Sequence, residues 1–163
     1  MPSLKCLVSV AALFGATVTF AQPYASKGEV AGWRIFVNEA NSSCFMEIVT
    51  DEGLVMQMGT GGKVDMGYLG LYTEGETGIR DGETGEIRIG LGGLVYNGVA
   101  QGVQRDGYSG GYFIGNNPLM GFDLSTQSEM VVNPGSGREF TVDLSGAGEA
   151  MEATRACQME LAE

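Results

Sequence analysis

The residues Gly107-Tyr108-Ser109-Gly110-Gly111 have the Gly-x-Ser-x-Gly spacing of a hydrolase nucleophile elbow, in which a strained turn presents a serine between a strand and a helix. Such a serine needs a base to accept its proton, and the chain contains no histidine. The residues that follow, Tyr112 to Ile114, are typical of a strand rather than a helix. We therefore interpret Ser109 as a turn residue. The lack of histidine also excludes Ser-His-Asp and Cys-His catalysis and imidazole zinc sites.

A second set of residues with possible chemistry is the acidic segment from Glu74 to Glu86, where carboxylates alternate with glycines. Carboxylate and carbonyl oxygens are the ligands that Ca²⁺ takes. The segment lacks the Asp-x-Asp-x-Asp-Gly order of an EF-hand, and a solvated hairpin loop has a similar composition. A calcium-stabilised module is therefore one alternative, and its candidate ligands are Glu74, Glu76, Asp81 and Glu83.

Two carboxylates at a suitable separation hydrolyse a glycosidic bond without histidine, and tyrosines can form a platform for a sugar. The sequence pairs no particular two of its 20 acidic residues. Aromatic residues in a sheet are also common core or cross-strand partners. A carboxylate-only enzyme acting on a glycan is thus a second alternative, with candidate platform residues Tyr68, Tyr72, Tyr96, Tyr108 and Tyr112.

The first 21 residues have the pattern of a secretory signal peptide, with Lys5 before an apolar run from Leu7 to Phe20. The run is shorter than the roughly 20 apolar residues that span a bilayer. We expect cleavage after export, which leaves residues 22–163 as one domain in the periplasm or outside the cell, without a transmembrane segment. The chain has 20 acidic and 9 basic residues, and removing Lys5 gives a net charge of −12. This acidity argues against binding nucleic acid or anionic lipid.

Cys44 and Cys157 remain after the signal is removed, and an even pair of cysteines in an exported chain predicts a disulfide. The bridge would close a loop of nearly the whole domain and contribute about 4–5 kcal/mol on the loop-entropy model. A redox or thiolate metal site is disfavoured because no Cys-x-x-Cys spacing is present.

The elements that must position these residues are short strands. From Val30 to Leu144, apolar stretches are separated by glycine, Asp-Gly and Asn-Pro, which predicts a mainly β domain, a single antiparallel sandwich or partly closed barrel. Alternation predicts one buried and one solvated face for each strand. A tight hairpin is predicted at Asp51-Glu52-Gly53. The predicted strands contain or span Trp33 to Val37, Cys44 to Ile48, Leu54 to Met58, Val64 to Tyr72, Ile87 to Ile89, Leu94 to Ala100, Gly111 to Ile114 and Phe140 to Leu144.

Two helices are predicted. Asn117 caps Pro118 at the start of a short helix that ends near Ser125. Ser145 caps a C-terminal helix whose apolar stripe places Cys157 on the buried side, facing a sheet on which Cys44 also points inward. The stripe consists of Ala147, Ala150, Met151, Thr154, Cys157 and Leu161.

Short motifs along most of the mature chain resemble a group of small exported alphaproteobacterial proteins of uncharacterised role: Gly32-Trp33-Arg34, Cys44-Phe45-Met46-Glu47, Gln57-Met58-Gly59, Gly67-Tyr68-Leu69-Gly70, Gly110-Gly111-Tyr112, Asn117-Pro118, Val142-Asp143-Leu144-Ser145-Gly146 and Ala156-Cys157-Gln158. The chain is more distantly similar to invasion-associated locus B proteins, which are also small, exported and cysteine-bridged. These resemblances imply a periplasmic location and supply no catalytic residues.

Because no complete catalytic set is found, the leading hypothesis is a non-enzymatic periplasmic or secreted protein. It would bind an envelope protein or a small ligand through its sheet face or its glycine-rich loops. The glycan-directed enzyme and the calcium-stabilised module are the alternatives.

Overall fold

The structure is a computed structural model that describes residues 24–60 and 66–162. The predicted signal peptide and the first two residues of the predicted strand from Val64 lie outside these ranges. No helix among the described residues is long and apolar enough to cross a membrane.

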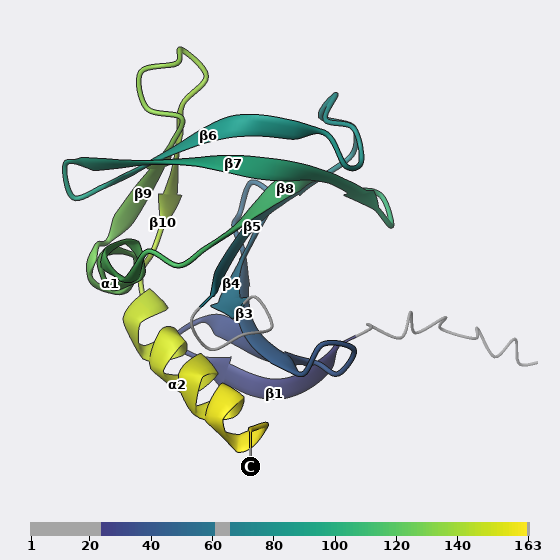
Figure 1. The fold of residues 1–163 in the computed structure, drawn as a ribbon, viewed down its shortest axis with the longest axis vertical. Helices are drawn as coiled ribbons and strands as arrows, with labels where there is room; N and C mark the ends of the chain where they lie inside the picture. The colour runs from purple at the N-terminus through teal and green to yellow at the C-terminus, as the bar shows by residue number, and fades with distance from the viewer. Residues whose placement is uncertain (1–23, 61–65, 163) are drawn as a thin grey trace, which may run out of the picture.

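The described residues form one antiparallel sheet of ten strands with two α-helices, and the sheet curls without closing (Figure 1). This confirms a mainly β domain that ends in a helix. The strand order is β1-β2-β3-β4-β5-β8-β7-β6-β9-β10, so β5 pairs with β8 rather than with β6, its neighbour in sequence. The elements are β1 (Ala25–Val30), β2 (Trp33–Asn38), β3 (Ser43–Val49), β4 (Leu54–Thr60), β5 (Gly67–Glu74), β6 (Thr84–Leu91), β7 (Leu94–Arg105), β8 (Tyr108–Gly115), α1 (Pro118–Thr126), β9 (Glu129–Val132), β10 (Phe140–Asp143) and α2 (Ala147–Glu160).

One face of the sheet, here called the inner face, carries the hydrophobic core and both helices. Alternate residues of β2 point into it, and Trp33 is fully buried there. The indole Nε1 of Trp33 donates a hydrogen bond of 2.9 Å to the carbonyl oxygen of Ser145. This bond ties the second strand to the segment that leads into α2, and it pairs the polar atom of a buried ring.

The predicted hairpin turn and the predicted cap of the first helix are both confirmed. The backbone N–H of Gly53 donates to Thr50, closing the predicted turn between β3 and β4. The side chain of Asn117 accepts hydrogen bonds from the N–H groups of Leu119 and Met120, so it caps α1 as expected.

The C-terminal helix confirms most of the predicted stripe but not its cap. Ala147, Ala150, Thr154 and Cys157 are buried, whereas Leu161 is exposed. The N-cap residue is Gly146, in the left-handed conformation with φ of 77°, and no side chain of the described residues caps the helix. Ser145 instead donates its hydroxyl to Asp143 Oδ1 at 2.7 Å.

Gly146 is required here for two reasons. Its positive φ disfavours residues with a Cβ atom. A Cβ at this position would also collide with the carbonyl oxygen of Ala31, in the turn between β1 and β2. The start of α2 therefore packs directly against the backbone of the first hairpin.

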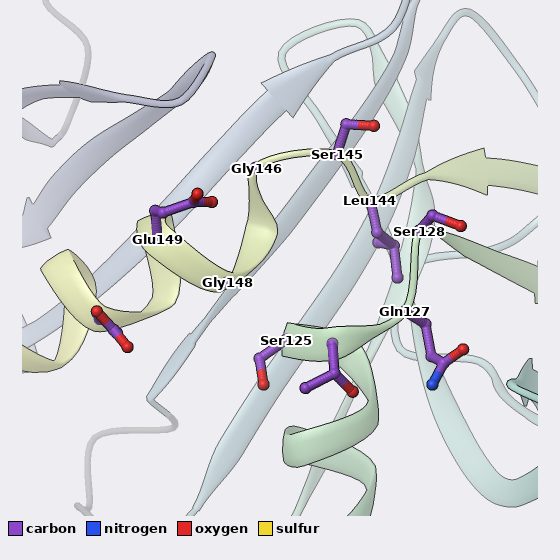
Figure 2. A pocket seen from close by; sticks show the side chains of 10 residues that line it. Ser125, Gln127, Ser128, Leu144, Ser145, Gly146, Gly148 and Glu149 are labelled. Atoms are coloured by element: carbon purple, nitrogen blue, oxygen red, sulfur yellow. The ribbon is translucent and has the colours of Figure 1, made fainter.

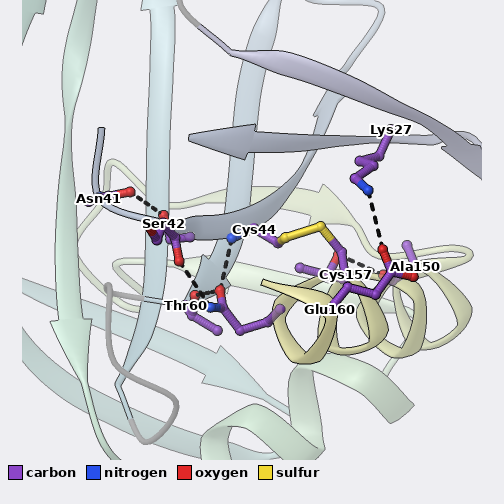
Figure 3. Close-up of a disulfide and its surroundings, with 11 residues drawn as sticks. Lys27, Asn41, Ser42, Cys44, Thr60, Ala150, Cys157 and Glu160 are labelled. Atoms are coloured by element: carbon purple, nitrogen blue, oxygen red, sulfur yellow. Dashed lines mark hydrogen bonds and ion pairs between the residues drawn. A yellow bond between two sulfur atoms is a disulfide. The ribbon is translucent and has the colours of Figure 1, made fainter. Parts of the chain in front are cut away.

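Cys44 on β3 and Cys157 on α2 form the predicted disulfide, with their Cα atoms 6.1 Å apart (Figure 3). The next residue, Gln158, adds hydrogen bonds beside the bridge. Its Oε1 accepts from the N–H of Cys44 at 2.9 Å and from the hydroxyl of Thr60 at 2.6 Å. Its Nε2 donates to the carbonyl of Ser42 at 3.0 Å. One turn of α2 is thus joined to β3 and β4 by a covalent bond and by polar contacts.

Candidate functional site

The outer face of the sheet, opposite the core, carries a row of cross-strand partners that we call the polar rung. Arg34 alternates with the buried Trp33 and Ile35, so its side chain lies on this outer face. The register then pairs one residue from each strand in turn, from β2 across β3, β4, β5 and β8 to β7. The members of the polar rung are Arg34, Glu47, Gln57, Gly70, Tyr112 and Gln101.

A chain of hydrogen bonds runs along the first part of the polar rung. The Arg34 guanidinium is paired with one carboxylate oxygen of Glu47, and Gln57 Nε2 donates to the other at 2.7 Å. The Glu47 side chain is only 12% exposed, and these two donors compensate its loss of water. The hydroxyl of Tyr68 donates to Gln57 Oε1 at 3.0 Å and lies 2.5 Å from the hydroxyl of Tyr72.

Gly70 lies between Tyr68 and Tyr72 on β5 and makes their contact possible. Side chains two residues apart on a strand point to the same face, so the two rings flank the glycine. A Cβ at Gly70 would lie 2.6 Å from both hydroxyl oxygens. The rings therefore lean over the space that a side chain would occupy.

The tyrosines at this point are held in their neutral form. Burial, together with neighbouring Tyr72, raises the pKa of Tyr68 well above its ordinary value of 10.0. Burial also raises the pKa of Tyr72. Both hydroxyls thus act as uncharged hydrogen-bonding groups at neutral pH.

The far end of the polar rung carries a third tyrosine. Tyr112 on β8 donates its hydroxyl to Gln101 Oε1 on β7 at 3.1 Å. Its ring centroid lies 5.7 Å from that of Tyr68, with the planes tilted by 39°. A half-buried aromatic pair is therefore bordered on both sides by side-chain amides, those of Gln57 and Gln101.

An aromatic cluster lies beside the polar rung on the same face. Phe36 stacks on Phe45 with centroids 5.4 Å apart, and Tyr24 meets Phe45 edge-on at 4.8 Å. The Arg34 guanidinium lies 5.5 Å from the centre of the Phe36 ring, within the range of a cation–π contact.

This cluster corrects the prediction of a solvated outer face for β2 and β3, because Phe36 and Phe45 are 4% and 6% exposed. The sequence contained a signal for it. Ile35-Phe36-Val37 and Cys44-Phe45-Met46 are consecutive apolar runs, which are typical of strands buried on both faces.

The five candidate platform tyrosines are divided by the fold. Tyr68, Tyr72 and Tyr112 gather on the outer face. Tyr96 packs against the core and donates to Asp123 Oδ2 on α1 at 2.5 Å, a bond that raises the pKa of Tyr96 to about 12. Tyr108 is exposed at the start of β8, outside the polar rung.

The interpretation of Ser109 as a turn residue is wrong. Ser109 lies in β8 and is 2% exposed. Its hydroxyl is hydrogen-bonded to that of Thr77 at 2.6 Å. Its neighbour Gly110 pairs with Tyr72 of β5, so the residues after the serine continue the sheet as the sequence indicated.

The acidic segment from Glu74 to Glu86 is fastened to the β7–β8 hairpin. The N–H of Gly75 donates to the carbonyl of Gly107, and that of Gly82 donates to the carbonyl of Gly102. Two of its carboxylates bond to backbone: Asp81 Oδ1 accepts from the N–H of Gln104, and Glu83 Oε2 accepts from the N–H of Arg80.

All four candidate calcium ligands, Glu74, Glu76, Asp81 and Glu83, are exposed. In residues 24–60 and 66–162, no three His, Cys, Asp or Glu side chains lie close enough together to hold a metal ion. Calcium binding by this segment stays a prediction.

A separate shallow pocket of about 430 Å³ lies between the end of α1 and the start of α2 (Figure 2). It is open to solvent and lined mainly by small polar residues, with Glu149 and Glu152 from α2. Glu149 lies in the first turn of α2, where its charge complements the helix dipole. Helix stabilisation thus explains the position of Glu149 without a ligand. The outer face is therefore the stronger candidate for binding.

No protein-family model, curated protein or solved structure matches this chain.

Proposed function

We propose that the protein is a non-enzymatic binding protein of the periplasm or the secreted fraction, and that it binds its ligand on the outer face of β2–β8. The observation that carries this proposal is the hydrogen-bond chain from Arg34 through Glu47, Gln57 and Tyr68 to Tyr72. Both described helices pack on the opposite face, where their buried residues join the core.

The groups of the polar rung are suited to binding because they are already ordered. They project from paired strands, and hydrogen bonds between side chains restrict their rotamers. A ligand therefore meets a surface whose conformational entropy has largely been lost on folding, which favours affinity.

The same contacts favour binding over hydrolysis. Hydrolysis of a glycosidic bond by carboxylates requires an acid and a base or nucleophile on either side of the bond. Both carboxylate oxygens of Glu47 are engaged, one by Arg34 and the other by Gln57. Glu47 thus holds Arg34 and Gln57 in position and is poorly placed to exchange a proton with a substrate.

The proposed compartment is supported by two features. Residues 1–21 have the pattern of a cleaved export signal. Cys44 and Cys157 are joined as a disulfide, which persists in oxidising compartments and is rare in the cytosol.

Chemical footprinting of tyrosine tests the proposed face. The folded protein is nitrated at low reagent concentration with and without an envelope extract, and each modified tyrosine is located by mass spectrometry. We expect the extract to protect Tyr112, in the polar rung, while Tyr108, exposed on the same strand, reacts equally in both samples. Equal modification of Tyr112 in both samples would contradict the proposal.

A further inference from the structure

We infer that the ligand of the outer face is an uncharged oligosaccharide that lies across the strands along the polar rung. This inference rests on the proposed function and assigns its ligand class. It is carried by the arrangement of Tyr68, Tyr112, Gln57 and Gln101, and by the charges around them.

The tyrosine rings and the amides match the two kinds of surface that a sugar presents. A sugar ring presents apolar C–H groups on its faces and hydroxyls around its rim. Tyr68 and Tyr112 supply aromatic surface 5.7 Å apart, and Gln57 and Gln101 border it with amides that donate and accept hydrogen bonds. Aromatic contact surface with a few fixed polar groups is the usual composition of small-ligand sites.

The amide of Gln101 is placed to contact such a ligand. Its oxygen accepts the hydroxyl of Tyr112, and within the described part of the chain its two N–H groups are not engaged in hydrogen bonds. They are available to donate to a sugar hydroxyl next to the Tyr112 ring.

The charges along the polar rung also favour an uncharged ligand. The chain carries a formal net charge of −11, yet Arg34 and Glu47 neutralise each other within the polar rung, and Glu29 of β1, the exposed cross-strand partner of Arg34, lies beyond its β2 end. Its other members, Gln57, Gly70, Tyr112 and Gln101, are uncharged residue types. An anionic polymer would be repelled by the protein as a whole, and between Glu47 and Gln101 a cationic one would meet only a carboxylate already paired with Arg34. An uncharged, hydroxyl-rich chain matches this local neutrality.

The length of the polar rung favours an oligosaccharide over a single sugar. The polar rung crosses six strands from β2 to β7. Neighbouring strands are about 4.8 Å apart, so its five interstrand steps cover a path of about 24 Å along the curled sheet. A single sugar ring would touch a small part of this row, whereas an oligosaccharide would contact the amide and tyrosine positions together.

Isothermal titration calorimetry on the oxidised protein tests the inference with maltohexaose, cellohexaose and chitohexaose as probes, and with glucose and N-acetylglucosamine as the matching monomers. We expect at least one hexasaccharide to bind, and its monomer to bind at least about tenfold more weakly. Tyr112→Ala should weaken binding by about tenfold, the equivalent of roughly 1.4 kcal/mol, which is within the range for aromatic contacts. The matched control Tyr108→Ala removes an exposed tyrosine of the same strand and should leave binding unchanged.

Two further variants separate loss of binding from loss of folding. Gln101→Ala keeps the rings and removes the amide, and Tyr112→Phe keeps the ring and removes its hydroxyl. Both should retain the melting temperature to within a few degrees and weaken binding less than Tyr112→Ala. If Tyr112→Ala unfolds the protein, the reduced affinity of Gln101→Ala at an unchanged melting temperature supports the site, and an unchanged affinity contradicts it.

The inference is overturned if none of the three hexasaccharides binds at millimolar concentration, or if Tyr112→Ala and Gln101→Ala both bind as the unaltered protein does. It is also overturned if an oligogalacturonate of equal length binds more tightly than the neutral chains. If no hexasaccharide binds but an envelope extract protects Tyr112 from nitration, the ligand class is wrong while the proposed binding face stands. If Tyr112 is not protected either, both proposals fail.

Discussion

The hydroxyl groups of Tyr68 and Tyr72 meet 2.5 Å apart above Gly70, where a side chain would occupy the space between them. This contact is the last in the hydrogen-bond chain that begins at Arg34.

Replacing Gly70 with alanine should separate the two hydroxyls. We expect Gly70→Ala to lower the free energy of unfolding by about 1–2 kcal/mol, from lost hydrogen bonding and crowding. Gly85→Ala is the matched control, because a Cβ at Gly85 of β6 meets nothing within 4 Å. Urea denaturation measures both. If Gly70→Ala were as stable as Gly85→Ala, the packing of the Tyr68 and Tyr72 rings would not depend on the missing side chain at position 70.

The raised tyrosine pKa values predict a loss of stability in alkali. The pKa of Tyr96 is about 12 in the folded protein, and those of Tyr68 and Tyr72 also lie above the ordinary value of 10.0. Because the unfolded chain releases these protons first, their contribution is complete below pH 10 and declines as the pH rises from 10 towards the folded values.

Two measurements check this prediction. The free energy of unfolding should fall steadily as the pH is raised from 10 to 12. A spectrophotometric titration of the folded protein should show three tyrosines that ionise above the ordinary pKa of 10.0. Ionisation of all tyrosines together near the ordinary value would contradict the burial of Tyr68 and Tyr72.

Reduction of the disulfide should destabilise the fold. Cys44 and Cys157 are 113 residues apart in sequence, and opening a loop of this size costs about 4–5 kcal/mol on the entropic model. The melting temperature should fall on adding reductant and should be insensitive to reductant in a Cys44→Ser, Cys157→Ser double variant. Two free thiols in protein isolated from the periplasm would be the opposite of what we expect.

Gln158 should act together with Thr60 in holding α2 to the sheet. Gln158→Ala removes the acceptor for the Cys44 N–H and for the Thr60 hydroxyl, and should lower the free energy of unfolding by about 1–3 kcal/mol. A double-mutant cycle with Thr60→Val isolates the shared bond, for which we expect a coupling of about 1 kcal/mol. Additive effects would indicate that the two side chains act independently.

Local features of this protein could be read from its sequence. Alternation at Trp33, Ile35 and Val37 predicted the inner face of β2, and Asn117-Pro118 predicted the start of α1. The helical spacing that includes Ala150 and Cys157 placed the second cysteine on the buried side of α2. These features depend on the period of side chains along a single element and on caps a few residues away.

The polar rung could not be read from the sequence, because its members are brought together by the tertiary structure. Arg34, Glu47, Gln57, Tyr112 and Gln101 become neighbours only through the register of five strand pairs. One of those pairs joins β5 to β8, which are adjacent in the sheet although β6 and β7 separate them in the sequence. A shift of one residue in any pair would turn a side chain to the other face. Because register is set by packing between distant segments, the sequence determined which residues could share a face, and the folded sheet decided which of them meet.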